Sequence, residues 1–460
     1  MKRGEGRVVM GLLFFPRGGS SHVARQLATS LPATGWDVTI VSGSLSLPGR
    51  PGDAREFYRG LDVRPVDFTA ALDAADPLLA DPPFHPSYED RADAPDRIMA
   101  ALDDARYEHQ VGAWAAALEA AGAAEADVLH LHHLTPLNAA AERVAPDVPV
   151  VGHLHGTELL MLEAIAAQGG AGWPHAAAWA ERLRAWAQRC ARLIVLSATQ
   201  VERAERSLGI DPARCVRIPN GFDPAAFQRR PLDRRAHWRR HLVTDPQGWA
   251  PGGEAGSVAY TEADLAAFDG DAPVLLYVGR FTEVKRVGLL IEAYTRARAR
   301  FARRAPLVLL GGFPGEWEGE HPLETIRRVG AEDVFLAGWH GHDELPAFLS
   351  AADAIVLPSV REQFGQVLVE GMACGLPAIA VDAYGPGEIV RAGATGWLVA
   401  PDDVEDLAQA LLEAVNEPGE RARRGREASR VAHERFAWPN LAGHVAAVYD
   451  ATRSDGLEAA

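Results

Sequence analysis

Short apolar runs alternate with stretches of helical spacing along almost the whole chain. The first run covers residues 7–15 and leads through a Gly-rich turn and a helical stretch into a second run near residue 40. Later runs end on polar or glycine residues, as at 149–156. Continuous apolar runs indicate strands buried on both faces, and their alternation with helices predicts a parallel sheet covered by helices. A second series of such runs, from 273 to 400, predicts a second sheet of the same kind.

Chain length and the two series together predict two domains of the α/β class. The 460 residues exceed the roughly 250–300 at which a single core stops growing. We expect an N-terminal Rossmann-like domain over 1–222, completed by a helix at 437–453, and a C-terminal Rossmann-like domain over 273–436. Residues 223–272, rich in Pro, Gly and charge, are interpreted as a linker plus an inserted loop. Residues 77–97, dense in Asp and Pro, are interpreted as a surface excursion.

Composition limits the partners and the compartment. A net charge of -16 would repel a phosphate backbone, so we expect no nucleic acid partner. No run approaches the roughly 18 apolar residues of a membrane span, and the N-terminal apolar stretch lacks a signal-peptide cleavage site. Three cysteines at distant positions favour a reducing compartment, and the sequence therefore predicts a cytoplasmic protein.

Two cations on one loop of the second half form a candidate phosphate site. Lysine occurs only at Lys2 and Lys285, and Lys285 follows Arg280 on the loop after an apolar run. Cations at the carboxyl edge of a parallel sheet are placed to neutralise a diphosphate. The alternative is a solvated loop with two ordinary charges, which the rarity of lysine disfavours. In the first half, Gly18 and Gly19 would let backbone N–H groups approach a phosphate or sugar, although such a turn also commonly connects strand to helix.

Two glutamates eight positions apart frame the start of a predicted helix in "VLPSVREQFGQVLVEGMACGLP". The helix start offers free N–H groups and a positive dipole to a phosphate. Glu362 would accept hydrogen bonds from sugar hydroxyls, and Glu370 would hold both hydroxyls of a ribose. In the alternative interpretation, one glutamate complements the helix dipole and the other lies at the surface. The expected donor-binding residues of this segment are Phe364, Gly365, Gln366, Val367 and Glu370.

Five histidines, at 130, 132, 133, 153 and 155, lie at the ends of two predicted strands. Such a group could bind a transition metal, but alternate residues of a strand point to opposite faces, and we expect no metal. His155 is interpreted as a contact to the donor sugar or the reacting oxygen, and His133 as an acceptor contact. A helix near residue 183 carries an apolar stripe with Trp179 and Trp186, which would either touch an anionic membrane or pack into its own domain.

The spacing of Glu362 and Glu370, with Phe364-Gly365 between them, closely resembles the E-x7-E signature of retaining family 4 glycosyltransferases with the GT-B fold. "GRFTEVKRVGLLIEAY", "IPNGFD" and "GPGEIVRAGATGWLVAPDD" resemble further segments of that family, and the resemblance runs from the first Gly-rich loop to the last helix. "YGPGE" departs from the family, with Gly387 where proline is common. The resemblance implies that Arg280 and Lys285 hold the donor diphosphate, Glu362 the transferred sugar and Glu370 the ribose. It also implies that Gly19 and His155 approach from the N-terminal domain.

The sequence therefore predicts a retaining hexosyltransferase that uses a nucleoside-diphosphate sugar and needs no further cofactor. The acceptor is a small molecule, a glycan or a lipid-linked molecule, and the strand end at Gly338 and Trp339 is expected to recognise the base. Two alternatives stay open: a nucleotide-sugar epimerase of the same architecture and a catalytically silent sugar-nucleotide-binding protein. A phosphorylase is disfavoured, because the only internal lysine lies in the diphosphate loop and none remains for pyridoxal phosphate.

Overall fold

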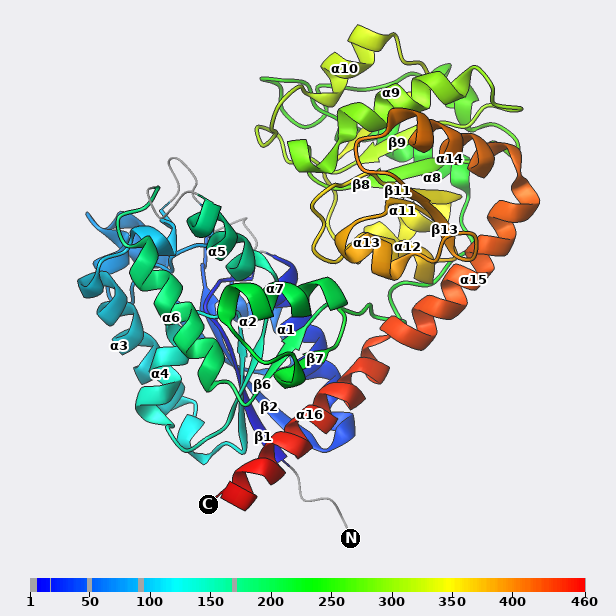
Figure 1. Ribbon diagram of the computed structural model, residues 1–460. Coiled ribbons are helices and arrows are strands. Elements are labelled where there is room, and N and C mark those ends of the chain that lie inside the picture. The colour runs from blue at the N-terminus through cyan, green and yellow to red at the C-terminus, as the bar shows by residue number, and fades with distance from the viewer. Residues whose placement is uncertain (1–5, 17, 48–51, 90–94, 168–171, 460) are drawn as a thin grey trace. The chain divides into compact units, whose positions relative to one another are not determined.

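The chain forms two compact units, each built around a parallel sheet with helices on both faces (Figure 1). Unit 1 comprises Met1–Asn220 and Trp438–Ala460, and unit 2 comprises Gly221–Ala437. The predicted α/β class with two doubly wound parts is confirmed. The computed structural model describes residues 6–16, 18–47, 52–89, 95–167 and 172–459.

Unit 1 contains a seven-stranded sheet in the order β3-β2-β1-β4-β5-β6-β7. All neighbouring strands run parallel. Strands β2 and β3 are added on one side of β1, and β4 to β7 are added on the other side. The carboxyl ends of β1 and β4 therefore form the topological switch point at which sheets of this kind bind ligands. The strands are β1 Gly6–Leu12, β2 Trp36–Ser44, β3 Asp62–Asp67, β4 Val128–His132, β5 Val150–His153, β6 Arg192–Val195 and β7 Cys215–Arg217.

Helices cover both faces of the unit 1 sheet (Figure 1). One face packs against α3, α4, α5, α6 and α7, and the other packs against α1 and the C-terminal helix α16. The helices of unit 1 are α1 Gly19–Ser30, α2 Ala54–Phe57, α3 Asp104–Ala120, α4 Pro136–Val144, α5 Thr157–Ala167, α6 Ala176–Arg189, α7 Ala198–Leu208 and α16 Trp438–Ala459.

The apolar stripe considered for membrane contact lies on α6 and is buried. Trp179, Leu183 and Trp186 are at most 4% exposed and belong to the core beneath the helix. The stripe thus packs into its own unit, as an amphipathic covering helix does. Within the described residues, no helix is long and apolar enough to cross a bilayer.

The expectation of a surface excursion over residues 77–97 is wrong for its aromatic residues. Phe84, His85 and Tyr88 are all less than 9% exposed, and Phe84 and Tyr88 belong to the core. The Tyr88 hydroxyl donates a hydrogen bond to the carbonyl of Leu134, just after β4. A few buried aromatic residues therefore hold a polar, Pro-rich segment against the end of the sheet. The high content of Asp and Pro in this segment led to the wrong prediction of a surface position.

Unit 2 contains a six-stranded parallel sheet in the order β10-β9-β8-β11-β12-β13, which reverses between β8 and β11. Its strands are β8 Leu275–Val278, β9 Leu307–Leu310, β10 Val334–Gly338, β11 Ala354–Leu357, β12 Ala378–Val381 and β13 Gly396–Val399. Helix α9 packs against α10 and α14, and α12 packs against α15. The helices are α8 Arg234–Arg239, α9 Val287–Arg298, α10 Pro322–Val329, α11 Leu345–Ala351, α12 Gln366–Ala373, α13 Tyr384–Ile389, α14 Val404–Asn416 and α15 Pro418–Phe436.

The segment 223–272 belongs to unit 2 and covers the β10 edge of its sheet. Gln247 forms a parallel bridge with Gly338 at the end of β10. Trp249 is fully buried, and its indole Nε1 donates to the carbonyl of Gly312 at 2.8 Å. Gly338 has φ +78°, and a Cβ there would lie 1.9 Å from the carbonyl oxygen of Gln247. Only glycine fits this close approach of two backbones.

Gly338→Ala is expected to lower the free energy of unfolding by about 2–4 kcal/mol, because it combines a left-handed backbone with a backbone clash. Gly330→Ala is the matched control, since Gly330 has φ +63° but open space at its Cβ position. It should cost only the backbone strain, about 1–2 kcal/mol. Thermal and urea unfolding measure both variants, and equal losses would contradict the role given to the Gln247 contact.

Candidate functional site

The loops that follow β8 and β11 meet at the switch point of unit 2. The amide of Val360 donates to the carbonyl of Val284 at 3.0 Å, and the Ser359 hydroxyl donates to the same carbonyl at 3.2 Å. These bonds join the loop after β11 to the 3-10 turn Glu283–Lys285. As a result Lys285 and Glu362 form an ion pair, with 19% and 18% of their side chains exposed. The structure thus brings together two residues that the sequence assigned to different parts of a donor.

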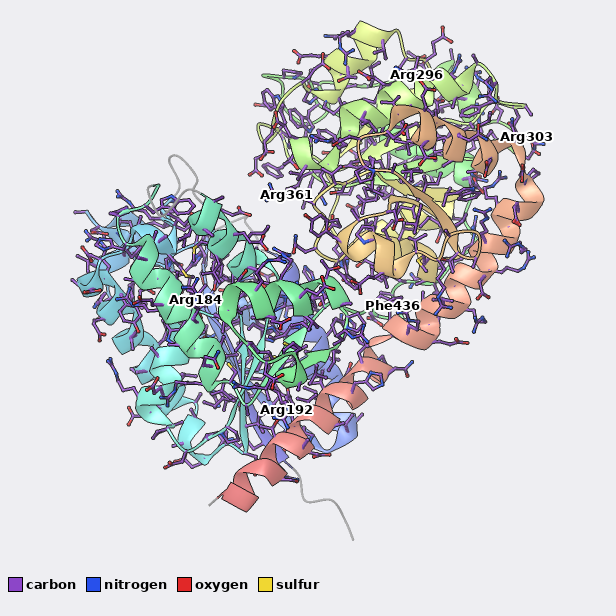
Figure 2. All side chains as sticks on the ribbon, in the orientation of Figure 1. Arg184, Arg192, Arg296, Arg303, Arg361 and Phe436 are labelled. Carbon is purple, nitrogen blue, oxygen red and sulfur yellow. The ribbon has the colours of Figure 1, made fainter. Side chains whose placement is uncertain are left out.

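Arg280 lies on the same loop as Lys285 and is exposed. Its carbonyl accepts a hydrogen bond of 2.7 Å from the hydroxyl of Tyr277, which is buried at the end of β8. Burial, and then the charge of Glu362, raise the pKa of Tyr277 well above its usual value, so this hydroxyl stays a donor at neutral pH. Within the described part of the chain the Arg280 guanidinium forms no ion pair. Arg361, beside Glu362, is also exposed (Figure 2).

The start of α12 is shaped by two glycines. Gly365 is the N-cap with φ +99°, a conformation that L side chains rarely adopt. Gly385, at the start of α13, packs so closely that a Cβ would lie 2.2 Å from the carbonyl oxygen of Phe364. Its amide donates to the carbonyl of Glu362 at 3.2 Å. The amides of Gln366 and Val367 belong to the first turn of α12, where N–H groups have no partner inside the helix.

Glu370 is buried inside α12 and held by two side chains. Its Oε1 accepts from Nε2 of His342 at 2.9 Å and from Nε2 of Gln366 at 3.1 Å. The same Gln366 nitrogen donates to the carbonyl of Gly221 at 2.7 Å. With 3% of its side chain exposed, Glu370 does not fit the alternative of a glutamate at the surface. His342 was missed by sequence reasoning, because it lies on the loop after β10, far from the E-x7-E segment.

The predicted base-recognition residues occupy two different environments. Gly338 packs against Gln247 in the bridge at the end of β10, whereas Trp339 is 50% exposed. Trp339 meets the ring of Phe313 edge to face at 5.9 Å, and Phe313 is 51% exposed. Phe313 follows β9, so two exposed aromatic rings extend from the carboxyl ends of neighbouring strands. Sequence reasoning missed Phe313, which stands in an ordinary Gly-Gly-Phe turn.

An aromatic cluster supports the Arg280–Lys285 loop. Phe281, next to Arg280, lies 6.0 Å from the ring of Trp249, which also contacts Trp317 at 5.6 Å and His321 at 4.5 Å. The amide of Glu318 donates to the carbonyl of Phe281 at 2.9 Å. The segment 223–272 therefore contributes a buried indole behind the cationic loop. The interpretation of residues 223–272 as a linker and inserted loop did not predict that Trp249 would pack against this loop.

In unit 1, Gly18 and Gly19 are exposed at the start of α1. Gly18 is the N-cap without a side-chain cap, and a Cβ at either glycine would meet nothing within 4 Å. Packing therefore does not require glycine at these two positions. Arg17 lies outside the described residues.

The strand register brings four of the five histidines onto one side of the sheet. His132 pairs with His153 across β4 and β5. Nε2 of His130 and Nδ1 of His153 are 3.2 Å apart, and Nδ1 of His132 is 2.9 Å from Nε2 of His155. Alternation along the strands therefore does not separate these four residues, and the ring of His133 also lies 4.4 Å from that of His155.

Three of these histidines could hold a metal ion by proximity alone. Ring nitrogens of His130, His132 and His153 lie within 4.8 Å of one another. Both nitrogens of His130 are already engaged, however, one with His153 and the other with the hydroxyl of Tyr449 on α16. Burial lowers the pKa of His130 to about 3 and holds those of His132, His153 and His155 well below the usual range. These imidazoles are therefore neutral at pH 7.

Two family models match this chain. "Glycosyltransferase Family 4" matches residues 17–226, and "Glycosyl transferases group 1" matches residues 263–431. D-inositol 3-phosphate glycosyltransferase of Rhodococcus jostii is 31% identical over 256 residues, which are 55% of this chain and 50% of that protein. Glycogen synthase of Mycobacterium tuberculosis is 35% identical over 184 residues, 39% of this chain and 42% of that protein. The chain thus spans about half the length of the curated relatives it matches.

Solved structures share the fold over nearly the full length. Sucrose-phosphate synthase from Thermosynechococcus elongatus has a TM-score of 0.67 at 20% identity, with 98% of this chain and 100% of that chain covered. HepE from Anabaena, in complex with UDP and glucose, has a TM-score of 0.64 at 17% identity, with 96% and 99% covered. The two Rossmann-like units define a protein of the glycosyltransferase GT-B class. Between them the two family models span most of the chain, and it belongs to the family 4 glycosyltransferases.

The neutral, buried His130 predicts an acid-sensitive unit 1. Its folded pKa of about 3 lies below the ordinary value of about 6.5 expected in the unfolded chain. Stability from this group is constant above about pH 6.5 and falls as the pH drops towards 3, because only the unfolded state then binds the proton. At pH 4.5 one such group costs about 2–3 kcal/mol.

The measurement is the melting temperature from pH 7.5 to 4.5 for the parent, His130→Phe and the control His444→Gln, which changes an exposed histidine. His130→Phe is expected to flatten the acid slope, whatever its effect at pH 7.5. An unchanged slope in His130→Phe would contradict the assignment.

Proposed function

We propose that this chain is a retaining glycosyltransferase that transfers a hexose-type sugar from a nucleoside-diphosphate sugar to an acceptor recognised by unit 1. The observation that carries the proposal is the pairing of Lys285 with Glu362 at the switch point of unit 2, beside the free N–H groups of α12. HepE from Anabaena, a solved neighbour of the same fold, binds UDP and glucose in its crystal structure, which supports a nucleotide-sugar donor.

The donor roles follow from charge and position. Lys285 and Arg280 would neutralise the diphosphate, together with the first N–H groups of α12. Because Lys285 is paired with Glu362, phosphate binding would draw Lys285 away and free the Glu362 carboxylate for sugar hydroxyls. Glu370, fixed by His342 and Gln366, would accept the hydrogen bonds of the ribose hydroxyls. Trp339, with Phe313 beside it, would contact the base.

The chemistry proposed is a front-face transfer without metal, organic cofactor or covalent intermediate, as the family resemblance implies. The bond from the sugar anomeric carbon to the phosphate oxygen breaks, and a bond to the acceptor oxygen forms. The acceptor proton passes to the leaving phosphate. Cations and helix N–H groups at the leaving group lower the barrier by stabilising the charge that develops there. The free cysteines support the further proposal of a cytoplasmic location.

Binding of a nucleoside diphosphate is the first test. A thermal-shift panel of UDP, GDP and ADP is expected to show stabilisation by one of them, about 2.7 kcal/mol at a hundred times its Kd. Lys285→Ala and Arg280→Ala should each weaken that binding about tenfold or more, since each removes a charge-assisted bond. Arg300→Ala changes an exposed arginine two residues after the end of α9 and should bind as the parent does. No response to any diphosphate would contradict the proposal.

Turnover is the second test, and it also separates the alternatives. Glu362→Gln is expected to lose at least about 100-fold of donor hydrolysis, the scale of one transition-state contact, while binding the diphosphate no more weakly than the parent. Glu332→Gln is the matched control, because Glu332 also pairs with an arginine, Arg298 at 2.8 Å, but precedes β10 at the opposite edge of the sheet. A new sugar nucleotide formed from the donor alone would indicate an epimerase. Binding without any turnover by the parent would indicate a silent binding protein.

A further inference from the structure

A buried carboxylate joins the carboxyl ends of β4 and β5 in unit 1. Glu158, in the first turn of α5, is fully buried. Its Oε1 accepts from the amide of His155 at 2.9 Å, and its Oε2 accepts from the hydroxyl of Thr157 at 3.2 Å. The same Oε2 lies 3.4 Å from Nδ1 of His133. Glu158 thus contacts both histidines that the sequence singled out for substrate contacts.

The charge of Glu158 dictates where His133 carries its proton. Burial alone would raise the pKa of this carboxyl, but the hydrogen bond and the electrostatic attraction of His133, together with the backbone amides, outweigh it and lower the pKa. Glu158 is therefore ionised at neutral pH, and an ionised carboxylate only accepts hydrogen bonds. Nδ1 of His133 is then the donor at this contact, and the hydroxyl of Thr157, which donates to Oε2 and also lies 3.4 Å from Nδ1, can accept from the same nitrogen. When the ring carries a single proton on Nδ1, Nε2 is left as an acceptor, as in other histidines oriented by a carboxylate.

His133 adopts an unusual backbone conformation. Its φ is +64°, which costs a non-glycine residue about 1–3 kcal/mol, and residues strained in this way cluster at functional sites. The ring lies 5.2 Å from Phe14 and 5.7 Å from Tyr88. Burial, and then the charge of Glu158, raise the pKa of Tyr88 well above its usual value, so Tyr88 brings no second negative charge.

The free nitrogen of His133 is the atom available to a ligand. His133 keeps 6% of its side chain exposed, and within the described residues its Nε2 makes no hydrogen bond. It lies just after β4, at the switch point of the unit 1 sheet. A neutral nitrogen lone pair receives a hydrogen bond from a hydroxyl or an amine, whereas a fully ionised phosphate or a carboxylate offers it no proton.

We propose that Glu158 is a positioning residue that keeps the proton of His133 on Nδ1, so that Nε2 of His133 accepts a hydrogen bond from a hydroxyl group of the acceptor. This inference rests on the proposed glycosyltransferase function and narrows its acceptor. The group of the acceptor next to His133 is a hydroxyl and not a phosphate.

Imidazole ¹⁵N NMR at pH 8 tests the tautomer on the intact chain. The His133 signals are assigned by their loss in His133→Asn. The parent is expected to show His133 protonated at Nδ1. In Glu158→Gln the amide donates to Nδ1, so the proton should move to Nε2. Glu163→Gln is the matched control: it changes the same helix and breaks the ion pair with Arg203 at 2.7 Å, and it should leave His133 unchanged.

A parent His133 protonated at Nε2, or an unchanged tautomer in Glu158→Gln, would overturn the proposal. If Glu158→Gln does not fold, the parent spectrum alone decides. Glycerol, as a hydroxyl probe, should shift the Nε2 resonance saturably, and inorganic phosphate should not; the opposite pattern, or no shift with glycerol, overturns it as well. The diphosphate panel on unit 2 is independent of this spectrum, so failure of the proposed function and failure of this inference are distinguishable.

Discussion

The ion pair between Lys285 and Glu362 depends on the topological switch point between β8 and β11. Because the strand order reverses there, two loops that are far apart in sequence end at the same edge and are joined through the carbonyl of Val284. An ion pair that is mostly buried needs a compensating environment, since desolvation of both charges is costly. Here each charge of the pair neutralises the other. Under the proposed function, a diphosphate would replace the carboxylate as the partner of Lys285. The same contact thus joins the two loops, and under the proposed function it would hold Lys285 and Glu362 in place for the donor.

The surrounding structure keeps this edge of the sheet in one conformation. Trp249 supports the cationic loop from behind, Gly365 and Gly385 allow the close packing at the start of α12, and His342 with Gln366 fixes Glu370. Unit 1 shows the same principle at its own switch point, where Glu158 joins the ends of β4 and β5. In both units a buried carboxylate and its few hydrogen-bond partners hold one another in place.

Sequence reasoning was strong where local pattern decides the structure. Apolar runs separated by helical stretches predicted two parallel sheets, and the E-x7-E spacing placed Glu362 on a loop and Glu370 within a helix, as observed. It was weak where the contact depends on register or on distant loops. The partner of Glu370 is His342 at the end of another strand, and the packing of Trp249 and Tyr88 could not be read from segments dominated by Pro, Gly and Asp. The sequence alone could not show that His130, His132, His153 and His155 share one face, because this depends on the register between β4 and β5.

The most direct measurement is a crystal structure of the chain with whichever of UDP, GDP and ADP stabilises it in the thermal-shift panel. We expect the diphosphate to lie within hydrogen-bonding distance of Nζ of Lys285 and of the first amides of α12. The ribose hydroxyls should contact Glu370, and Glu362 should be released from Lys285. A nucleotide bound elsewhere on unit 2, or a diphosphate that leaves the pair of Lys285 and Glu362 intact, would contradict the proposed donor site.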